Sequence, residues 1–538
     1  MSSLTWGQYL YIGGVFVAAI VLHRLRKRAS LLRIPGPRSA NWLLGNEWEI
    51  YNNVAGRVWN RWIDLYGPVV LYKNAFFNGY TVLLADPIAV KSLLSDGPDG
   101  YTWHKPPFNR QTNERLLGRG VIWAEGDDHR VQRRLLSPAF SPTSTRLVSD
   151  AFWETADNLK SVLQRQIDLD PARTARVNAA DLMSRAALDV IGLAGFEHKF
   201  HAVLSASREA VSITDGLHQA LGAPPGWRMF LTLNLAKSFP FIFNHAPLKA
   251  IQNQRASKAS IDIVAYKVLA DAKKSLLEKD GKSILSILLQ ESQKGGEKLS
   301  EKEIVDNFST MITAGHETTG ITLSLILYEL SRNQPFQDLL RKELFAVGGG
   351  QLSFDDLQSG KATHLDAVIK EVLRVYPANI RIIRRAETDQ VLPLSQPLPS
   401  AKERAGDTQL LIPANTDVVI PLAAINTLKS IWGPDAHLFK PERWLEKDGI
   451  PETVKVLPQG YERIFTFVSG PRACLGMRFA LAEMRVLLSQ ILSSYIFTPI
   501  DDANIPLDIV SPAQIMIRAQ DPTRGIYGVP LRVREVKN

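Results

Sequence analysis

The stretch FTFVSGPRACLGMRF, residues 465–479, contains Cys474, the only cysteine among the 538 residues of the chain. A free cysteine is usually a small buried apolar residue, and that remains one interpretation here. Apolar residues recur at helical spacing from Met477 onward, so Cys474 is expected at or just before a helix N-terminus. Unpaired backbone N–H groups and the helix dipole lower the pKa of a thiol at such a place. The stretch therefore also predicts a thiolate, either a nucleophile or a metal ligand.

The composition is that of an ordinary globular protein, with 45% hydrophobic and 22% charged residues. We find neither a Gly-, Ser- or Pro-rich linker nor a fixed-period repeat in the body of the chain, which favours one large catalytic domain. A lone cysteine excludes an intrachain disulfide framework and a Cys-based zinc finger, and it agrees with a reducing compartment. The sequence contains no HExxH, GxSxG or P-loop pattern, so those catalytic classes are not indicated.

The N-terminus is apolar and is followed by basic residues. Residues 4–22 carry no charge, and HRLRKR follows at 23–28. A stretch of this length can cross a bilayer core, and the basic flank places the remainder on the cytoplasmic side. We therefore predict a membrane anchor over 1–28, a proline-rich hinge over 29–40 and a single catalytic domain over 41–538. A buried core helix is the alternative for the apolar stretch. Anionic lipid headgroups explain the basic residues beside the anchor better than nucleic acid does.

A long helix is predicted over residues 301–333. Ser300 and Glu303 form a capping-box pattern at its start, and Pro335 marks its end. At 1.5 Å per residue, this helix would be about 50 Å long and would cross the whole molecule. Its middle, GHETT at 315–319, interrupts two apolar stretches. These residues form either a satisfied or solvated polar cluster, or a proton-delivery group in the wall of a buried cavity, with Glu317 and Thr318 as its members.

Glu371 and Arg374 lie in a predicted helix that Pro377 stops. Their spacing of three places both side chains on one helix face, where such a pair is most often a surface ion pair of small energy. Arg443 follows later, in the proline-led turn FKPERW. Nothing in the spacing shows whether these three side chains meet.

Taken together, these patterns resemble the motifs of the cytochrome P-450 superfamily. The segment FVSGPRACLG at 467–476 matches the haem-binding signature FxxGxRxCxG at each position. AGHETT at 314–319 resembles the oxygen-activation stretch, EVLR at 371–374 the ExxR pair, and PERW at 441–444 the PERF segment. The resemblance runs from residue 35 to about residue 520. It implies a mainly α fold with small β-sheets and a long central helix over the haem, preceded here by the predicted transmembrane helix.

The resemblance implies a role for each motif residue. Cys474 would be the axial thiolate ligand of the iron of haem b. Glu317 and Thr318 would relay the protons that leave as water. Arg472, Arg133 and Arg384 would pair with haem propionates. The other residues expected to bind the haem are His129, Phe467, Gly470, Gly476 and Ala314. Glu371, Arg374 and Arg443 would form a buried salt-bridge network beneath the haem, and such a network is costly to break by removing one member.

Three positions depart from the family pattern. His129 stands four residues before Arg133, where the family often has Trp, and an imidazole can still donate a hydrogen bond to a propionate. Trp444 replaces the usual Phe of the PERF segment. Arg381 lies in a segment that lines the cavity and is usually apolar in the family, so it either faces away or meets an acidic or oxygenated substrate group.

The electrons are expected from a partner protein, because the sequence shows no flavin or dinucleotide-binding module. The resemblance implies NADPH-cytochrome P-450 reductase, with cytochrome b5 as a further candidate, docking on the cysteine side. The candidate basic contacts are Arg130, Arg134, Arg463 and Arg478. The resemblance also implies an endoplasmic reticulum membrane protein with its catalytic domain on the cytoplasmic face and no nucleic-acid partner.

A small lipophilic substrate is expected. Residues 222–248 are apolar and punctuated by prolines, so they form either a loop that dips into the membrane or a buried helix connection. By resemblance, the substrate cavity is lined by 101–123, 210–230, 310–314, 378–383 and 512–517. The chain resembles fungal members of the family most, which suggests a terpenoid or other secondary metabolite.

The function expected from these patterns is insertion of one oxygen atom from O₂ into that substrate, with NADPH-derived electrons. There are two alternatives. A haem-thiolate isomerase or dehydratase would act without O₂ or reductase, although the intact Glu317 and Thr318 argue against it. A haem-binding sensor or carrier would show no turnover.

Overall fold

The structure is a computed structural model that describes most of the chain. The described residues are 30–39, 41–54, 56–76, 78–95, 102–205, 207–221, 226–239, 248–275, 283–294, 298–348, 352–398, 408–500, 507–511, 516–520 and 527–536. The predicted anchor over 1–28 lies outside them, as do both ends of the predicted hinge. Within these ranges, no helix combines the length and the apolar character that crossing a bilayer requires.

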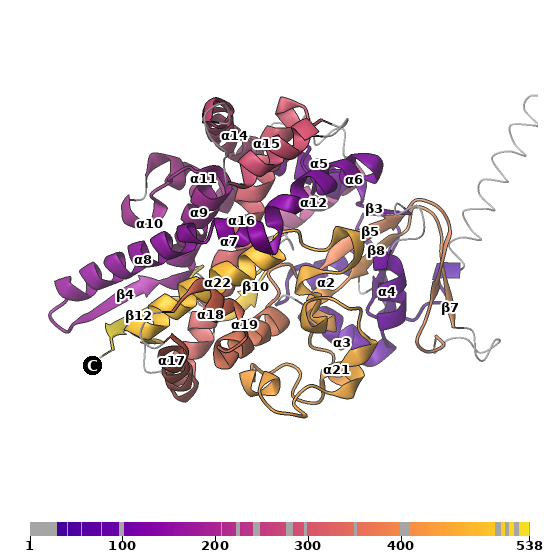
Figure 1. The fold of residues 1–538 in the computed structure, drawn as a ribbon. Helices are drawn as coiled ribbons and strands as arrows, with labels where there is room; N and C mark the ends of the chain where they lie inside the picture. Colours follow the sequence, from indigo (N-terminus) through magenta and orange to yellow (C-terminus); the bar gives the residue numbers. More distant parts are fainter. Residues whose placement is uncertain are drawn as a thin grey trace, which may run out of the picture.

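Helices dominate the described residues, and the strands form small sheets, as expected (Figure 1). The α-helices are α2 (Glu47–Tyr51), α3 (Arg57–Tyr66), α4 (Pro87–Ser95), α5 (Pro107–Leu117), α6 (Gly126–Leu136), α7 (Pro142–Leu147), α8 (Asp150–Leu169), α9 (Ala179–Phe196), α10 (Ala202–Ser205), α11 (Arg208–Leu221), α12 (Trp227–Ser238), α14 (Lys249–Ser275), α15 (Ile284–Lys294), α16 (Glu301–Arg332), α17 (Gln334–Gly348), α18 (Phe354–Gln358), α19 (Thr363–Val375), α20 (Leu422–Ile425), α21 (Lys429–Trp432) and α22 (Met477–Ser494). The strands are β1 (Val69–Lys73), β2 (Tyr80–Leu84), β3 (Trp103–His104), β4 (Thr174–Asn178), β5 (Ile382–Ala386), β6 (Gln390–Pro393), β7 (Gln409–Ile412), β8 (Asp417–Ile420), β9 (Tyr495–Pro499), β10 (Asp508–Val510), β11 (Arg518–Gln520) and β12 (Pro530–Glu535).

The long helix α16 confirms the prediction over 301–333 to within one residue. The Ser300 side chain accepts the Glu303 backbone N–H, and the Glu303 side chain accepts the Ser300 backbone N–H, so both halves of the capping box are present. The helix ends at Arg332, before Pro335 in the next helix. It packs closely on α9 at Gly320, where an added Cβ would lie 2.6 Å from the Ser184 Cα. Glycine there allows the two backbones to approach.

The strands form separate small sheets, and the two larger ones lie toward opposite ends of the helical body (Figure 1). A five-stranded sheet has the order β1-β2-β8-β5-β3, and a three-stranded sheet has the order β4-β12-β9. Strands β2 and β8 are parallel, whereas β8 and β5 are antiparallel with Arg384 opposite Val418. The pairs β10-β11 and β6-β7 form the remaining sheets. Strand β5 therefore leads directly from the segment after Pro377 to Arg384, one of the predicted haem-binding residues.

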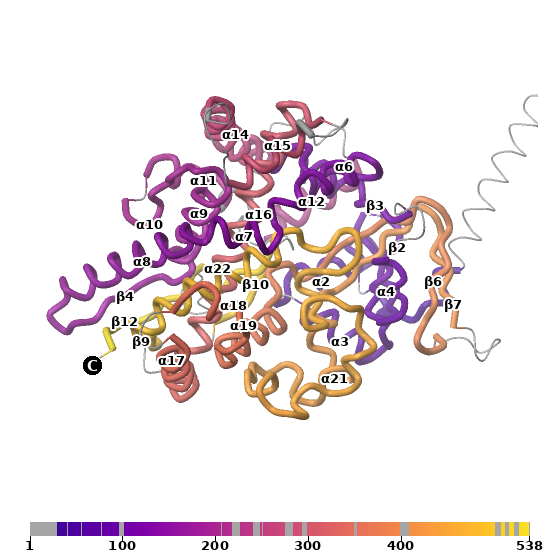
Figure 2. The backbone as a smooth tube through the Cα atoms, viewed as in Figure 1, coloured from indigo at the N-terminus to yellow at the C-terminus, as the bar shows by residue number. Residues whose placement is uncertain are grey.

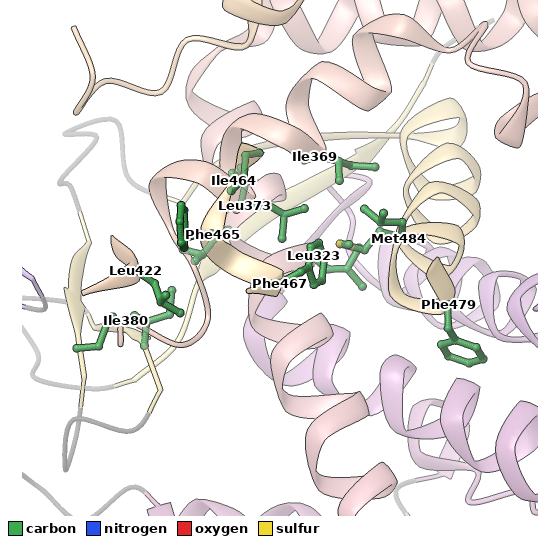
Figure 3. Close-up of a cluster of buried hydrophobic side chains, with 14 of the residues drawn as sticks. Leu323, Ile369, Leu373, Ile380, Leu422, Ile464, Phe465, Phe467, Phe479 and Met484 are labelled. Atoms are coloured by element: carbon green, nitrogen blue, oxygen red, sulfur yellow. The ribbon is translucent and has the colours of Figure 1, made fainter. Parts of the chain in front are cut away.

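The apolar core passes behind the loop of residues 465–476, which carries Cys474 and is here called the cysteine loop. Helices α16, α19 and α22 lie side by side there (Figure 2). Leu323 of α16, Leu373 of α19 and Met484 of α22 pack with Phe465 and Phe467 of the loop (Figure 3). Each of these five side chains is buried. Since a close-packed interior resists displacement, the loop that carries Cys474 is held by a rigid support.

Candidate functional site

The loop before α22 holds Cys474 in a fixed position. The backbone N–H of Cys474 donates to the Phe467 carbonyl oxygen at 2.8 Å, which closes the loop. Gly470 adopts a positive φ of 77°, and a Cβ there would lie 2.1 Å from the Leu94 carbonyl oxygen. The position thus excludes every side chain and requires glycine. Helix α22 begins at Met477 with Gly476 as its N-cap residue, so Cys474 precedes the helix as the sequence predicted.

Cys474 is an exposed residue, although neighbouring protein atoms partly desolvate its thiol. Burial raises its pKa, while a hydrogen bond from the Gly476 backbone N–H and the charge of Arg133 act in the opposite direction. The same two groups would stabilise a thiolate once a cation binds it. Throughout the described ranges, no three His, Cys, Asp or Glu side chains gather as a metal site.

Beside the cysteine loop lies a group of basic side chains, here called the cation cluster: Lys105, Arg133, Arg384 and Arg472. Arg133 Nη1 donates to the Ala473 carbonyl oxygen at 2.8 Å, directly before Cys474. Arg384 and Arg472 line the same small cavity. Three of the four are arginines that the sequence predicted to bind propionates, and the structure brings these three together with Lys105. Lys105 was missed, because nothing in TWHKPP marks it as different from a solvated lysine.

Glu125 lies within the cation cluster and was also missed. Its carboxylate forms an ion pair with Arg472 and lies 2.9 Å from Lys105 Nζ. Despite burial, which acts in the opposite direction, the charges of Lys105 and Arg472 hold the pKa of Glu125 below its usual value. The carbonyl oxygen of Ala124 also accepts from Lys105 and Arg472, at 3.2 and 3.1 Å. These contacts join segments far apart in sequence, so no local pattern predicts them.

The positive charges of the cation cluster shift the pKa values of neighbouring groups. Burial, followed by the charge of Arg472, lowers the pKa of Lys105 to about 7. Burial and the charges of Arg472, Lys105 and Arg133 lower the pKa of the buried His129 to about 3. A neutral imidazole and four basic groups beside one carboxylate form a site for a further anionic group. Both propionates of haem b would supply that charge, and the nearby Cys474 would supply an axial ligand. The residues present therefore fit haem b.

The polar residues in the middle of α16 lie within an unbroken stretch of helix. Thr318 Oγ1 donates to the Ala314 carbonyl oxygen at 2.7 Å, and the helix continues through this point without interruption. His316 is fully buried, and its Nδ1 donates to the Ile312 carbonyl oxygen at 2.7 Å. Thr318 is thus held against the helix by a hydrogen bond that can be exchanged for another acceptor.

The carboxylate of Glu317 lies near the His316 imidazole and the Arg518 guanidinium. Its Oε1 lies 3.3 Å from His316 Nε2, and its Oε2 lies 3.6 Å from Arg518 Nη2 of β11. The side chain of Glu317 is buried, which is unfavourable for a carboxylate without nearby positive charge. Arg518 supplies that charge from the C-terminal part of the chain. Sequence reasoning did not identify Arg518, because its segment contains no motif that points to α16.

Glu371, Arg374 and Arg443 meet in a fully buried network. Arg374 Nε and Nη2 donate to Glu371 at 2.9 and 2.7 Å, and both side chains have an exposed fraction of 0%. Arg443 Nε lies 3.5 Å from Glu371 Oε1, and its Nη2 lies 3.0 Å from Asp435 Oδ1. The alternative of a surface ion pair is therefore wrong for Glu371 and Arg374.

Trp444 contributes to the same network. Its indole N–H donates to Glu371 Oε2 at 2.9 Å. A phenylalanine at this position could not make that bond, so the departure from the family pattern adds a donor to the network.

Arg381 packs against the ring of Trp59 in α3. Its guanidinium carbon lies 5.6 Å from the ring centroid. Burial lowers the pKa of Arg381, while the charges of Tyr72 and Glu47 oppose this shift.

The chain is similar to known proteins over most of its length. A family model described as Cytochrome P450 matches residues 35–521. The chain is 30% identical over 524 residues to the protein named cytochrome P450 monooxygenase claW from Ampulloclitocybe clavipes, covering 95% of this chain and 94% of that one. It is also 30% identical over 503 residues to cytochrome P450 monooxygenase 128 from Postia placenta, covering 89% of this chain and 88% of that one.

Proposed function

The chain belongs to the cytochrome P450 family, and from that premise we propose that it inserts one oxygen atom of O₂ into a lipophilic substrate. It is an oxygen-incorporating oxidoreductase whose cofactor is haem b, with O₂ as oxidant and NADPH-derived electrons supplied by a partner. The observation that carries the proposal is the position of an accessible Cys474 thiol directly beside the cation cluster.

Each group of residues has a separate task in this proposal. When bound, the haem supplies the activation of O₂. Cys474 would ligate its iron, while Arg133, Arg384 and Arg472 would hold its propionates through charge-assisted hydrogen bonds. Phe467, Gly470, Gly476 and Ala314 shape the space around it. His129 is buried beside the cation cluster, where its imidazole can donate to a propionate.

Thr318 and Glu317 deliver protons from α16. The Thr318 hydroxyl can turn from the Ala314 carbonyl toward the reacting oxygen, because it gives up only one hydrogen bond. Glu317 takes up protons from solvent, and Arg518 holds its carboxylate in place. The Glu371, Arg374 and Arg443 network supports the cysteine loop from below.

The substrate is proposed to be a terpenoid or another lipophilic secondary metabolite. Two observations support this proposal: relatives from fungi are named monooxygenases, and part of the predicted membrane-facing segment 222–248 exposes apolar side chains. In α12 and just after it, Trp227 and Phe239 are 62% and 53% exposed, whereas Phe230 is buried against Trp48 of α2. Residues 222–225 and 240–247 lie outside the described ranges.

The partner is proposed to be a membrane-bound NADPH-cytochrome P-450 reductase, with cytochrome b5 as a second donor. Such a partner fits a chain held at the endoplasmic reticulum membrane by residues 1–28, with its catalytic domain on the cytoplasmic face. Arg130, Arg134 and Arg478 are exposed and suit an acidic partner. Arg463 donates instead to the carbonyl oxygens of Lys455 and Leu457, so we assign it a structural role.

Isotope labelling tests the proposed reaction. The full-length chain is expressed in yeast membranes with a reductase and supplied with a panel of sesquiterpene hydrocarbons under ¹⁸O₂. The expected result is a product that carries one ¹⁸O atom and forms only when NADPH and the reductase are both present. Product formation without them would support the isomerase or dehydratase alternative. A haem-loaded chain that converts no member of a wider panel of lipophiles would support the sensor or carrier alternative.

A further inference from the structure

We infer that Arg110 and Trp123 form a binding site for a carboxylate group on the substrate. This inference rests on the proposed function, since it concerns the molecule that is oxidised. It narrows the substrate class from lipophiles in general to lipophilic acids. The two residues are called the Arg110–Trp123 site below.

The two side chains stack on one another. The guanidinium carbon of Arg110, in α5, lies 3.9 Å from the centroid of the Trp123 ring. Cation–π attraction holds the guanidinium over the face of the ring and so restricts its position. A second arginine, Arg119, lies 5.1 Å from the same ring centroid. Two positively charged side chains thus lie close to the same ring.

Only one of these arginines is neutralised by a carboxylate. Arg119 Nε lies 2.9 Å from Glu114 Oε1, and the Arg119 side chain is 59% exposed. Arg110 is on the same helix as Glu114 but forms no ion pair with it or with any other residue that the structure describes. Arg110 is therefore available to an anion from outside the chain.

The Arg110–Trp123 site contains two buried donors without acceptors. The Nε of Arg110 and the Nε1 of Trp123 are both buried, and neither has a hydrogen-bond partner within the described ranges. Folded proteins rarely leave such donors unsatisfied, because each has lost its water without gaining another partner. One of these donors belongs to the positively charged Arg110 and the other to the neutral indole stacked on it, so the two oxygens of a carboxylate could accept from both while its charge neutralises Arg110.

Hydrogen bonds on both sides of Trp123 connect the Arg110–Trp123 site to the proposed catalytic centre. The backbone N–H groups of Arg119 and Val121 donate to Asp306 Oδ2 and Asn307 Oδ1, each at 2.9 Å, which fastens the segment before Trp123 to α16. A Cβ on Gly120 would lie 2.4 Å from Thr310 Oγ1, so the contact with α16 is close.

On the other side, Ala124 follows Trp123 directly, and its carbonyl oxygen accepts from Arg472 and Lys105 of the cation cluster. Trp123 therefore lies between the wall formed by α16 and the proposed propionate site. A substrate anchored there by its acid group would extend along α16.

The head group of the ligand decides the affinity in this proposal. A carboxylate accepts both donors and neutralises Arg110, an alcohol can accept a donor but leaves the charge, and an amine adds a like charge. The experiment uses three probes of equal chain length: dodecanoate, 1-dodecanol and dodecylamine. Binding to the haem-loaded chain is measured by equilibrium dialysis of the labelled probe and by the haem absorption shift, without NADPH or reductase.

The expected result is that dodecanoate binds at least about tenfold more tightly than 1-dodecanol, with dodecylamine weakest. Arg110→Leu should remove this preference and Arg110→Lys should retain part of it. Trp123→Phe keeps the ring but loses the N–H, so it should weaken dodecanoate binding severalfold. Arg119→Leu is the matched control and should leave the preference intact. The ferrous–CO spectrum of each variant reports whether it is folded and loaded.

Three outcomes would overturn the inference: no measurable binding of dodecanoate, equal binding of dodecanoate and 1-dodecanol, or a preference that survives Arg110→Leu. In the last case the two donors would be satisfied by water. Binding of dodecanoate through Arg110 without formation of any ¹⁸O product would instead count against the proposed function alone. The two failures are therefore distinguishable.

Discussion

At the scale of single residues, Glu371 lies at the centre of a buried polar network. It is fully buried and accepts hydrogen bonds from Arg374, from the Lys440 backbone N–H and from the Trp444 indole. A buried carboxylate is stable only when such donors surround it. Loss of one donor should therefore weaken the network even when the packing is preserved.

Trp444→Phe tests this at a single hydrogen bond. The variant keeps an aromatic ring but removes the indole N–H from Glu371. A hydrogen bond to a charged group contributes about 1.5–3 kcal/mol, so the free energy of unfolding should fall by roughly that amount. Urea titration measures this quantity. Trp42→Phe is the control, because Trp42 is 69% exposed and its replacement should leave the midpoint unchanged. Equal midpoints for Trp444→Phe and the native chain would show that the bond contributes nothing.

Thr318→Ala tests the proposed proton delivery. The variant removes the hydroxyl that donates to Ala314 in the resting arrangement. We expect NADPH consumption to continue while a larger share of its electrons appears as hydrogen peroxide, because protons no longer reach the reacting oxygen in order. The ratio of peroxide to NADPH measures this share. Thr322→Ala is a suitable control, since Thr322 makes the same back-bond one turn later, to Thr318. Full coupling in Thr318→Ala would assign proton delivery to another group.

At the scale of elements, helix α22 contains a buried acid that sequence reasoning did not identify. Glu483 is 1% exposed, and its Oε1 has no hydrogen-bond partner among the residues described. Burial raises the pKa of Glu483 well above its usual value of 4.5. The folded chain therefore favours the neutral acid, whereas the unfolded chain ionises it. Stability from this group is present at low pH and is lost as the pH rises above the unfolded value.

Glu483→Gln should remove this pH dependence, because glutamine stays neutral. Both pH 5.5 and pH 8 lie about one unit or more above the pKa of glutamate in the unfolded chain. Between these two pH values, the thermal midpoint of the native chain should fall by more than the midpoint of Glu483→Gln. At pH 8, Glu483→Gln should be the more stable of the two. Glu452→Gln is the control, since the Glu452 side chain is 83% exposed. Parallel pH profiles for the native chain and Glu483→Gln would contradict the assignment.

At the scale of the whole molecule, the elements with strong local signals could be predicted and the contacts between distant segments could not. The capping box and Pro335 predicted the bounds of α16, and the helical spacing of apolar residues from Met477 onward predicted the start of α22. The meeting of Glu371 with Arg443 followed only from the resemblance to a family. Glu125, Lys105 and Arg518 had no signal at all, because each acts through a residue brought near by tertiary packing.

The basic face around the cysteine loop is predicted to bind the reductase. Arg134 of α6 and Arg478 of α22 are both exposed. Arg134 lies near the cysteine loop because its neighbour Arg133 donates to the Ala473 carbonyl oxygen, and Arg478 lies in the first turn of the helix that follows the loop. Arg134→Glu combined with Arg478→Glu should raise the KM for reductase severalfold at low ionic strength, and about 0.5 M salt should reduce the difference by screening. Arg208→Glu, an exposed site on α11, is the control. A KM that is unchanged in the double variant would place the docking face elsewhere.

The proposed function depends most directly on ligation of haem iron by Cys474. The measurement is the absorption spectrum of the reduced, CO-treated holoprotein for the native chain, Cys474→Ala and Cys474→His. A thiolate ligand gives a strongly red-shifted Soret band, and we predict this band in the native chain only. Cys474→His is expected to retain haem through its imidazole with an unshifted band. A red-shifted band in either variant, or its absence from the haem-loaded native chain, would contradict the assignment.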